Sequence, residues 1–375
     1  MRYRIIFLIL LSFLIISCSD KPDTYTVETV DGVRHVHNTA PLWGSDERIS
    51  LEFVRKIGEL ESEDDNMMFH QPCYVVMDKE DNIYISDRGN HRIVKTDSKG
   101  DFILAFGNRG DGPGEFSYPG CIQIDSTGNL HVCDLRGIQI FNPEGEYIKS
   151  NRLPNVMSFK FIQNDLITVT DMIFRGSEYS DYFKQIETIP LVRIIDQTGN
   201  LINEFGKRRI YDDRWMRRLG NNFLLAVDFD NNFYLAFSNR NVIEKYSSDG
   251  NLLVKSSREL GFEESTEAVI VRANDRGGNL MPMHSRFSKS INIDGKNRMW
   301  IETYRRRMTI EERGEFNKVK IDDLISVEVY NDNGILLQRI PWEYGHLREI
   351  SYIKNDRLFC IDRSDMCIYE YKIIG

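Results

Sequence analysis

An internal repeat constrains the fold of this chain more than any other feature of its sequence. One half of the repeat reads as an apolar strand, a turn that contains Asp or Asn and a Gly, and a second strand. Because Gly supplies the positive φ of such a turn and the Asp or Asn side chain caps it, each copy predicts a β-hairpin. The copies lie at residues 92–107, 138–148, 191–206, 242–253 and 327–337.

The other half of the repeat precedes each hairpin and gives two short alternating strands joined by a polar turn. It is clearest at residues 74–87 and 121–134. Together the two halves make four antiparallel strands, which is one blade of a β-propeller. Weaker versions of this half lie at residues 161–171, 224–237, 291–303 and 350–362.

The two ends of the chain complement each other. Residues 366–374 read as a third strand with no fourth strand after it, and residues 49–58 match the strand that ends at Phe106 and Gly107. We therefore expect the last blade to combine three C-terminal strands with one N-terminal strand, which closes the ring and removes its open edge. Six blades of roughly 55 residues use up the chain from residue 46. The fold predicted for residues 46–375 is an all-β, six-bladed propeller of four-stranded antiparallel blades.

Short motifs in the first two blades resemble the NHL repeat, and the whole chain is similar to six-bladed β-propeller lipoproteins of bacterial envelopes. Residues 31–33, Asn38 and residues 41–43 resemble the lead-in segment of those proteins. The resemblance implies a fold and a location but no shared activity. The repeat-like motifs are residues 88–93, Phe106 and Gly107, residues 110–116 and Pro119.

The N-terminus resembles a bacterial lipoprotein signal. Arg2 and Arg4 precede an apolar run at residues 5–16, which is too short to span a bilayer comfortably. The run ends at Ser17 and Cys18, as in a lipobox, where the Cys becomes lipidated and N-terminal. We predict a signal peptide at residues 1–17, lipidation of Cys18, and a tether and lead-in at 18–45. An ordinary cleaved signal peptide and an uncleaved anchor are the alternatives.

Charge and cysteine content narrow the function. The formal net charge of -9 argues against a general nucleic-acid binder. The five cysteines after Cys18 are an odd number and lie mostly in apolar strand patterns, so we expect buried thiols rather than a disulfide framework. No phosphate loop, nucleophile elbow or catalytic triad is evident, and residues 107–114 read as a link between blades.

Arginines recur at or near the link between the second and third strands of each blade. Propeller geometry places these links, and the links between blades, on one face around the mouth of the central channel, where ligands bind in closed β folds. A guanidinium suits carboxylate, sulfate or phosphate. The alternative is that they are solvated charges paired with neighbours such as Asp87, Asp212 and Glu302. The predicted ligand-binding residues are Arg88, Arg136, Arg175, Arg240, Arg305 and Arg363, with Arg208 and Arg209 from a basic cluster.

Three histidines map near the same face. His70, His284 and His346 each precede an inner strand, in three adjacent blades. Three imidazoles with an open position can hold zinc, so they are a candidate site for a divalent metal. The alternative is that they are loop histidines with unrelated roles.

Three functional hypotheses follow, one of which is a purely scaffolding subunit whose basic face is buried against a partner. The leading hypothesis is a non-enzymatic recognition propeller, anchored in the cell envelope and exported to the periplasm or the surface. It would use no cofactor and would bind an anionic glycan, peptide or protein partner at the arginine-rich mouth. The second hypothesis is a metal-assisted hydrolase or lyase at the same mouth. Insertions at residues 172–190 and 305–323 are expected on that face too.

Overall fold

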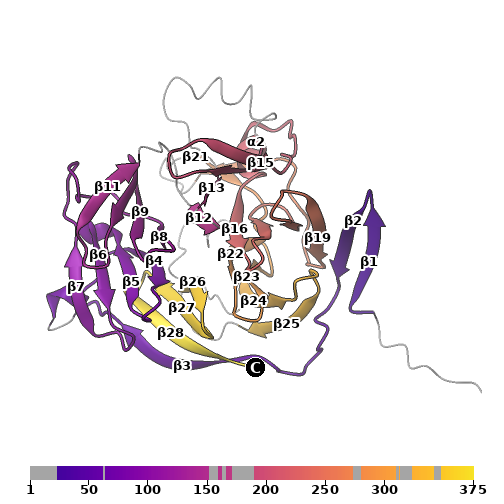
Figure 1. Ribbon diagram of the computed structural model, residues 1–375. Coiled ribbons are helices and arrows are strands. Elements are labelled where there is room, and N and C mark those ends of the chain that lie inside the picture. The colour runs from indigo at the N-terminus through magenta and orange to yellow at the C-terminus, as the bar shows by residue number, and fades with distance from the viewer. Residues whose placement is uncertain are drawn as a thin grey trace, which may run out of the picture.

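A computed structural model gives the architecture of the chain. It describes residues 23–61, 64–151, 159–162, 166–170, 190–272, 280–309, 312, 323–341 and 348–375. Six blades of four antiparallel strands form a ring, and the sheet of one blade is extended to six strands by an N-terminal hairpin (Figure 1). The six-bladed all-β prediction is therefore confirmed.

Blades one to three follow the chain order from the innermost to the outermost strand. Their strands are β4 (Pro72–Met77), β5 (Ile83–Asp87), β6 (Arg92–Thr96) and β7 (Phe102–Phe106) in blade one; β8 (Ile122–Ile124), β9 (Leu130–Asp134), β10 (Gly137–Phe141) and β11 (Tyr147–Asn151) in blade two; and β12 (Phe159–Ile162), β13 (Leu166–Thr170), β14 (Val192–Ile195) and β15 (Leu201–Phe205) in blade three.

Blades four to six differ because the N-terminal segment adds strands to two of them. Their strands are β16 (Phe223–Val227), β17 (Phe233–Phe237), β18 (Ile243–Tyr246) and β19 (Leu252–Arg258) in blade four; β22 (Ser288–Ile293), β23 (Met299–Tyr304), β24 (Ile325–Tyr330) and β25 (Leu336–Pro341) in blade five; and β26 (Arg348–Lys354), β27 (Arg357–Asp362), β28 (Cys367–Ile374) and β3 (Ser50–Ile57) in blade six.

The ring closes as the sequence predicts. β3 pairs antiparallel with β28, with Ile57 opposite Ile368, so the last blade joins both ends of the chain. The innermost strands contact one another in cyclic order, from β4 through β8, β12, β16, β22 and β26 back to β4. Apolar side chains fill the spaces between neighbouring blades. Val76 and Tyr84 of blade one, for example, share a buried cluster with Ile122 and Val132 of blade two.

The N-terminal segment also forms a strap, residues 23–49, on the outside of the ring. The hairpin of β1 (Tyr25–Val30) and β2 (Val33–Asn38) extends the sheet of blade four, because β2 pairs in parallel with β19 (Figure 1). The chain then crosses blade five, where the Leu42 N–H donates to the carbonyl of Leu336 at 2.8 Å. The lead-in predicted at 18–45 thus contains two strands that the repeat pattern does not reveal.

Asn38 ties the strap to two blades. Its side chain is buried and donates to the Ser256 hydroxyl at 3.0 Å and to the Gly334 carbonyl at 3.1 Å. Its amide oxygen accepts the Leu336 N–H at 2.8 Å. One side chain therefore satisfies groups of the strap, of blade four and of blade five.

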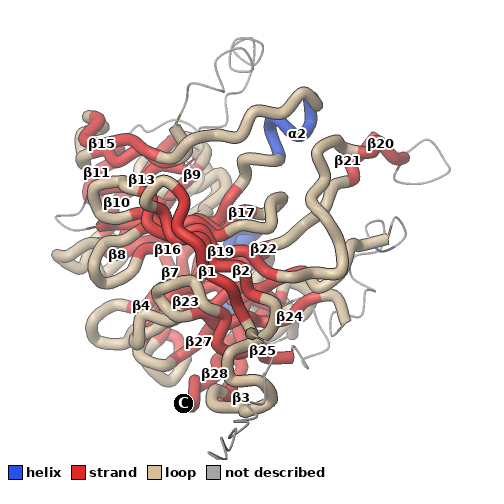
Figure 2. Tube along the Cα trace, turned by 90° about the vertical axis from the view of Figure 1, so that its right-hand side faces the viewer, coloured by secondary structure: helices blue, strands red, loops and turns tan. Residues whose placement is uncertain are grey.

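The two faces of the ring carry different connections. The turn face carries the turns between first and second strands and between third and fourth strands. The loop face carries the links between blades and the loops between second and third strands. The links before blades four and five contain α2 (Arg214–Leu219) and the hairpin of β20 (Val269–Arg272) and β21 (Leu280–Met283), which project together on one side (Figure 2). Short 3₁₀ helices lie in the link before blade one, η1 (Asp65–Met67), and in the loop between β5 and β6, η2 (Arg88–Asn90). No helix in the described ranges has the length and hydropathy to cross a bilayer.

Candidate functional site

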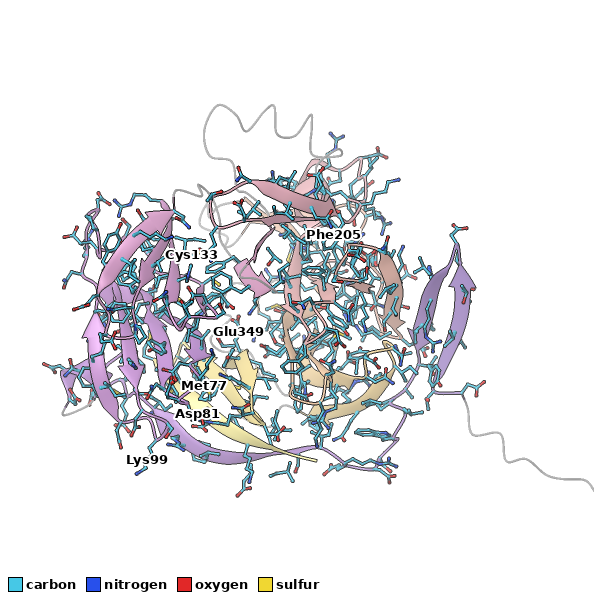
Figure 3. All side chains as sticks on the ribbon, in the orientation of Figure 1. Met77, Asp81, Lys99, Cys133, Phe205 and Glu349 are labelled. Carbon is cyan, nitrogen blue, oxygen red and sulfur yellow. The ribbon has the colours of Figure 1, made fainter. Side chains whose placement is uncertain are left out.

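A cavity of about 150 Å³ lies at the loop-face mouth of the channel. The inner strands all begin at the loop face, since the links between blades enter there, and the residues lining the cavity lie near those beginnings. Five of the six blades contribute, and Glu349 lies near the middle of the ring (Figure 3). The lining consists of Cys73 and Tyr74 of β4, Lys160 of β12, residues 223–225 of β16, residues 289–292 of β22 and residues 349–351 of β26.

Lys160 is a half-buried lysine at this mouth. The Thr168 hydroxyl holds its backbone, because it donates to the Lys160 carbonyl at 3.1 Å and accepts the Lys160 N–H at 3.0 Å. Burial lowers the pKa of the Lys160 ammonium, because desolvation disfavours the charged form. No carboxylate of the described residues forms an ion pair with it.

Lys289, by contrast, is neutralised within the fold. Its ammonium lies 2.9 Å from the carboxylate of Glu302, which is fully buried. Burial alone would lower the pKa of Lys289, but the charges of Glu302 and Glu349 outweigh it and raise the pKa. Glu302 also accepts the Ile350 N–H at 3.0 Å, so this ion pair links blades five and six.

Cys73 adds a thiol to the cavity, although not a reactive one. Burial raises its pKa, while the nearby charges of Arg88 and Arg363 oppose that effect only in part. A thiol with a raised pKa is a poor nucleophile at neutral pH. All five cysteines after Cys18 lie in described ranges, are buried and form no disulfide, which confirms the prediction of buried thiols.

Two of the predicted arginines lie close to the cavity. Arg88 and Arg363 both act electrostatically on the Cys73 thiol. The Arg88 side chain donates to the Pro119 carbonyl at 3.3 Å, and Arg363 lies 3.6 Å from the Glu349 carboxylate. The structure therefore brings these two together with Lys160 and Lys289 around the mouth.

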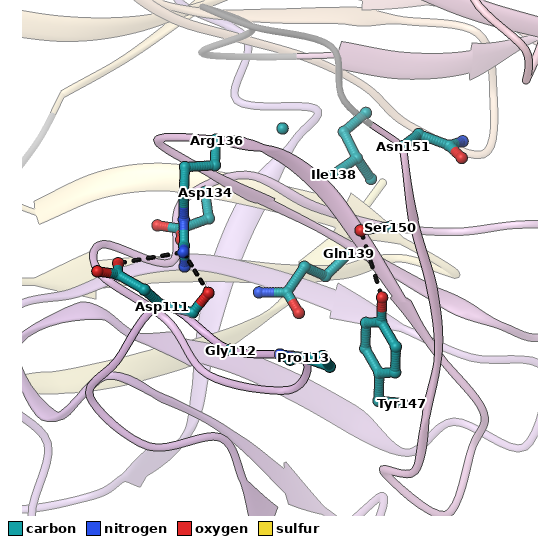
Figure 4. A pocket seen from close by; sticks show the side chains of 11 residues that line it. Asp111, Gly112, Pro113, Asp134, Arg136, Ile138, Gln139, Tyr147, Ser150 and Asn151 are labelled. Carbon is teal, nitrogen blue, oxygen red and sulfur yellow. Dashed lines mark hydrogen bonds and ion pairs between the residues drawn. The ribbon is translucent and has the colours of Figure 1, made fainter.

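Arg136 lies instead in a groove of about 230 Å³ on blade two (Figure 4). Its guanidinium lies 3.1 Å from the Asp111 carboxylate and 3.7 Å from that of Asp134, and it donates to the carbonyl of Gly110 at 3.2 Å. These contacts hold residues 110–111 of the link between blades one and two, and they balance the charge of Arg136.

The remaining predicted arginines divide into two groups. Arg240 stacks on the Phe237 ring, 3.3 Å from its centroid, and Arg209 lies 2.7 Å from the Glu264 carboxylate. Arg208, which precedes Arg209 in the chain, is buried. Arg305 is exposed, and its side chain bonds to none of the described residues. Arg175 and the Cys18 lipidation site lie outside the described residues.

The three candidate zinc ligands are only partly visible. His70 is exposed and packs against Gly89, His284 is half-buried, and His346 lies outside the described residues. Within the part of the chain that is described, no three His, Cys, Asp or Glu side chains form a group that could hold a metal ion. The zinc site stays a prediction.

The two lysines are the residues that the sequence analysis missed. Each occupies the second position of an inner strand, as Glu349 does in β26. A charged residue at the second position of an inner strand is therefore shared by blades three, five and six, whereas Cys73, Gln123 and Leu224 hold this position in the other three blades.

Comparisons with known proteins support the fold. A protein of Bacteroides fragilis named as a candidate exported protein superposes with a TM-score of 0.56 at 10% identity, over 90% of this chain and 98% of that one. A member of the DUF4221 family of Bacteroides vulgatus gives 0.56 at 11% identity, over 87% and 99%. The Drosophila melanogaster protein brain tumor is 25% identical over 146 residues, which is 37% of this chain and 12% of that protein's length.

A match to a known family covers more than half of the chain. Residues 44–276 match the family described as a 6-bladed beta-propeller. The match includes the closing strand β3 and blades one to four, whose arrangement the structure shows directly. This chain therefore belongs to the 6-bladed beta-propeller family.

Proposed function

We propose that this propeller is a non-enzymatic recognition protein of the cell envelope, which binds an anionic group of a ligand or protein partner at its loop-face mouth. The observation that carries the proposal is Lys160, a half-buried cation that lines the cavity and has no ion-pair partner among the carboxylates of the described residues. An uncompensated buried charge is costly, and a bound anion would remove that cost.

The size of the cavity limits what can enter it. Pockets for whole drug-sized ligands measure about 300–1,000 Å³, and this cavity measures about 150 Å³. A single carboxylate, sulfate or phosphate group fits that space better than a whole molecule does. The proposal is therefore that the mouth takes one acidic group of a larger glycan or peptide, whose remainder lies on the surrounding loops.

The proposed location follows from the N-terminus. A lipidated Cys18 would hold the propeller at a membrane, on the periplasmic or outer side, with the acyl chains buried in the bilayer. The tether then joins β1 on the outside of blade four, so the loop-face mouth stays open to ligands. Nucleic acid is not a proposed partner, because the net charge is -9.

A binding series tests the proposal. The purified protein is heated with acetate, sulfate, phosphate, a uronic-acid oligosaccharide and an acidic peptide, and the unfolding midpoint is measured. A ligand of the native state stabilises it by about 2.7 kcal/mol at a hundredfold excess over its Kd. We expect Lys160→Gln to weaken binding of a responsive anion about 10–100-fold, the value of a charge-assisted hydrogen bond. Lys99→Gln, on an exposed turn of the opposite face, is the matched control and should bind normally.

Three other results would redirect the proposal. Loss of binding in Arg305→Gln but not in Lys160→Gln would move the site from the cavity to the exposed loops. Normal binding by both variants would reject the mouth as the site. A zinc-dependent rise in the midpoint that His284→Ala abolishes would favour the metal-assisted hydrolase or lyase instead.

A further inference from the structure

The outer edges of the six blades share a protective feature. In every blade, the pairing of the third with the fourth strand contains a register shift. Such bulges twist a strand and break the even row of backbone groups that another strand could pair with. The bulges leave the outermost strands of five blades without a further partner among the described residues, and in blade four β19 pairs with β2 only over Val254–Arg258, beyond its bulge.

β1, which forms the edge of the extended blade-four sheet, lacks these features. Its six residue pairs with β2 run without a shift, and it contains no Pro, Lys or Arg. Glu28 is its one charged residue, and Val27 and Val30 are 40% and 42% exposed. The β20–β21 hairpin also pairs evenly, but it is shorter and Pro282 interrupts the donors of β21.

The pairing pattern shows which backbone groups of β1 face outward. The Thr39 N–H donates to the Thr24 carbonyl at 2.9 Å, so residues 24 and 39 form a hydrogen-bonded pair. In an antiparallel ladder such pairs alternate with pairs whose N–H and C=O groups point away. The groups of Tyr25, Val27 and Thr29 therefore point away from β2, and among the described residues no strand lies on that side.

We propose that β1 pairs antiparallel with β1 of a second copy of this chain, about a two-fold axis through Val27. In this register Val27 lies opposite Val27 of the second copy, and Tyr25 lies opposite Thr29. The groups that point outward are centred on Val27, so each finds a partner across the axis. The two blade-four sheets then become one continuous sheet.

The side chains fit a second copy of the same strand. Glu28 lies opposite Thr26 rather than opposite its own copy, so no like charges face each other. On one side of the sheet Tyr25 already packs against a buried cluster that contains Val36, Val254 and Ile335. Val27 continues that apolar side and is covered by its copy across the axis. Tyr, Thr and Val also favour strands.

Sedimentation velocity of the purified protein over a concentration series tests the proposal. A single pair of edge strands makes a small interface, so we expect a reversible dimer with a Kd of about 1 µM to 1 mM. Val27→Pro removes an N–H that points outward, and edge strands tolerate proline, so the hairpin should persist while dimerisation weakens at least about 10-fold. Val27→Thr keeps the N–H and should still dimerise.

Two results would overturn the proposal. One is a mass that stays at the 43.8 kDa of a single chain up to about 1 mM protein. The other is a dimer that Val27→Pro leaves unchanged, with circular dichroism confirming that the variant is folded. Because β1 is far from Lys160 in the fold, an anion titration of the Val27→Pro variant separates this proposal from the recognition proposal.

Discussion

The turn face and the loop face of this propeller are built by the same blades, yet one repeats and the other varies. On the turn face, an Asp begins the first turn of blades one, two, four and five. One oxygen of each carboxylate accepts the N–H groups two and four residues later, at 2.8–3.0 Å in all four blades. The residues are Asp78, Asp125, Asp228 and Asp294.

The second oxygen of these carboxylates is used in the same way in three blades. It accepts from His131 in blade two, Tyr234 in blade four and Trp300 in blade five, at 2.8–3.0 Å. These donors differ in chemistry but occupy the same position, six residues after the Asp. The turn face therefore conserves a hydrogen-bonding geometry between blades rather than a residue type.

The loop face repeats only in part: Gly58 and Gly107 lie under the rings of Phe69 and Phe116 in the links that precede blades one and two. The link between blades one and two is a compact turn in which Gly107 lies under the Phe116 ring, whereas the link between blades four and five carries the projecting β20–β21 hairpin. The charges differ as well, since Lys289 forms an ion pair with Glu302, whereas Lys160 forms none with the described residues. The difference indicates that the turn face specifies the fold, while the loop face varies from blade to blade.

The largest expected loss of stability from a change on the turn face is at Asp294. Asp294→Ala leaves the N–H groups of Lys296 and Arg298 and the indole N–H of Trp300 without their acceptor in a buried site. Each unsatisfied buried donor costs about 1–3 kcal/mol, so we expect the free energy of unfolding to fall by about 3–5 kcal/mol. Urea unfolding measures it.

Asp97 supplies the control for this substitution. Its carboxylate accepts the N–H groups of Lys99 and Asp101 in the same way, at 2.8 and 2.9 Å, but in the exposed turn between the third and fourth strands of blade one. Water can replace the lost acceptor there, so Asp97→Ala should be clearly the milder change. Equal losses at the two sites would show that burial does not set the importance of these turns.

A smaller loss of stability is expected at Gly145, in the turn between the third and fourth strands of blade two. Its φ is +81°, and a Cβ there would lie 2.7 Å from the Phe106 ring of the preceding blade. Gly145→Ala should therefore destabilise the protein by roughly 2–3 kcal/mol in the same urea assay, through backbone strain and overpacking.

Gly295 is the matched control for Gly145. It lies on the same face in a first turn, has no positive φ in the left-handed region, and has open space where a Cβ would be. Gly295→Ala should leave stability unchanged or raise it by up to about 1 kcal/mol. A comparable loss at both glycines would mean that the contact between neighbouring blades does not restrict Gly145.

The sequence predicts the turn face well because its signals are local. The Gly of each hairpin and the capping Asp or Asn lie within a few residues of one another, and the missing fourth strand of blade six is visible from the count. The β1–β2 hairpin escapes prediction because its partner, β19, is more than two hundred residues away and pairs in parallel. Nothing in the local pattern of Val33–Asn38 specifies that partner.

The candidate site at the channel mouth is even harder to predict from local sequence patterns. The recurrence of arginines directs attention to the loop face, where Arg88 and Arg363 lie near the cavity. Whether a charge is available, however, depends on its partners in space. Arg136 is held by Asp111, and Lys289 by Glu302, which follows it by 13 residues on the neighbouring strand. Only when these pairs are known does it become apparent that Lys160 has no ion-pair partner among the described residues.

The smallest expected effect on stability comes from removing the charge of Lys160. Lys160→Met replaces a half-buried, partly desolvated cation with an apolar side chain of similar length, so we expect a gain of about 1 kcal/mol near neutral pH. Burial lowers the folded-state pKa of Lys160 below its ordinary value of 10.5. As pH rises through that lowered pKa, the folded protein releases the proton before the unfolded chain does, and the stability of the unchanged protein increases.

The gain from Lys160→Met should therefore shrink as the pH approaches 10.5, and urea unfolding of both proteins across the alkaline range measures it. A gain that does not change with pH would mean that the ammonium is compensated in the folded state. The same comparison links stability to recognition, because an anion bound at the mouth should close the gap at neutral pH as deprotonation does at alkaline pH. An anion that stabilises both proteins equally binds elsewhere. In that case Lys160 destabilises the folded state without binding the anion.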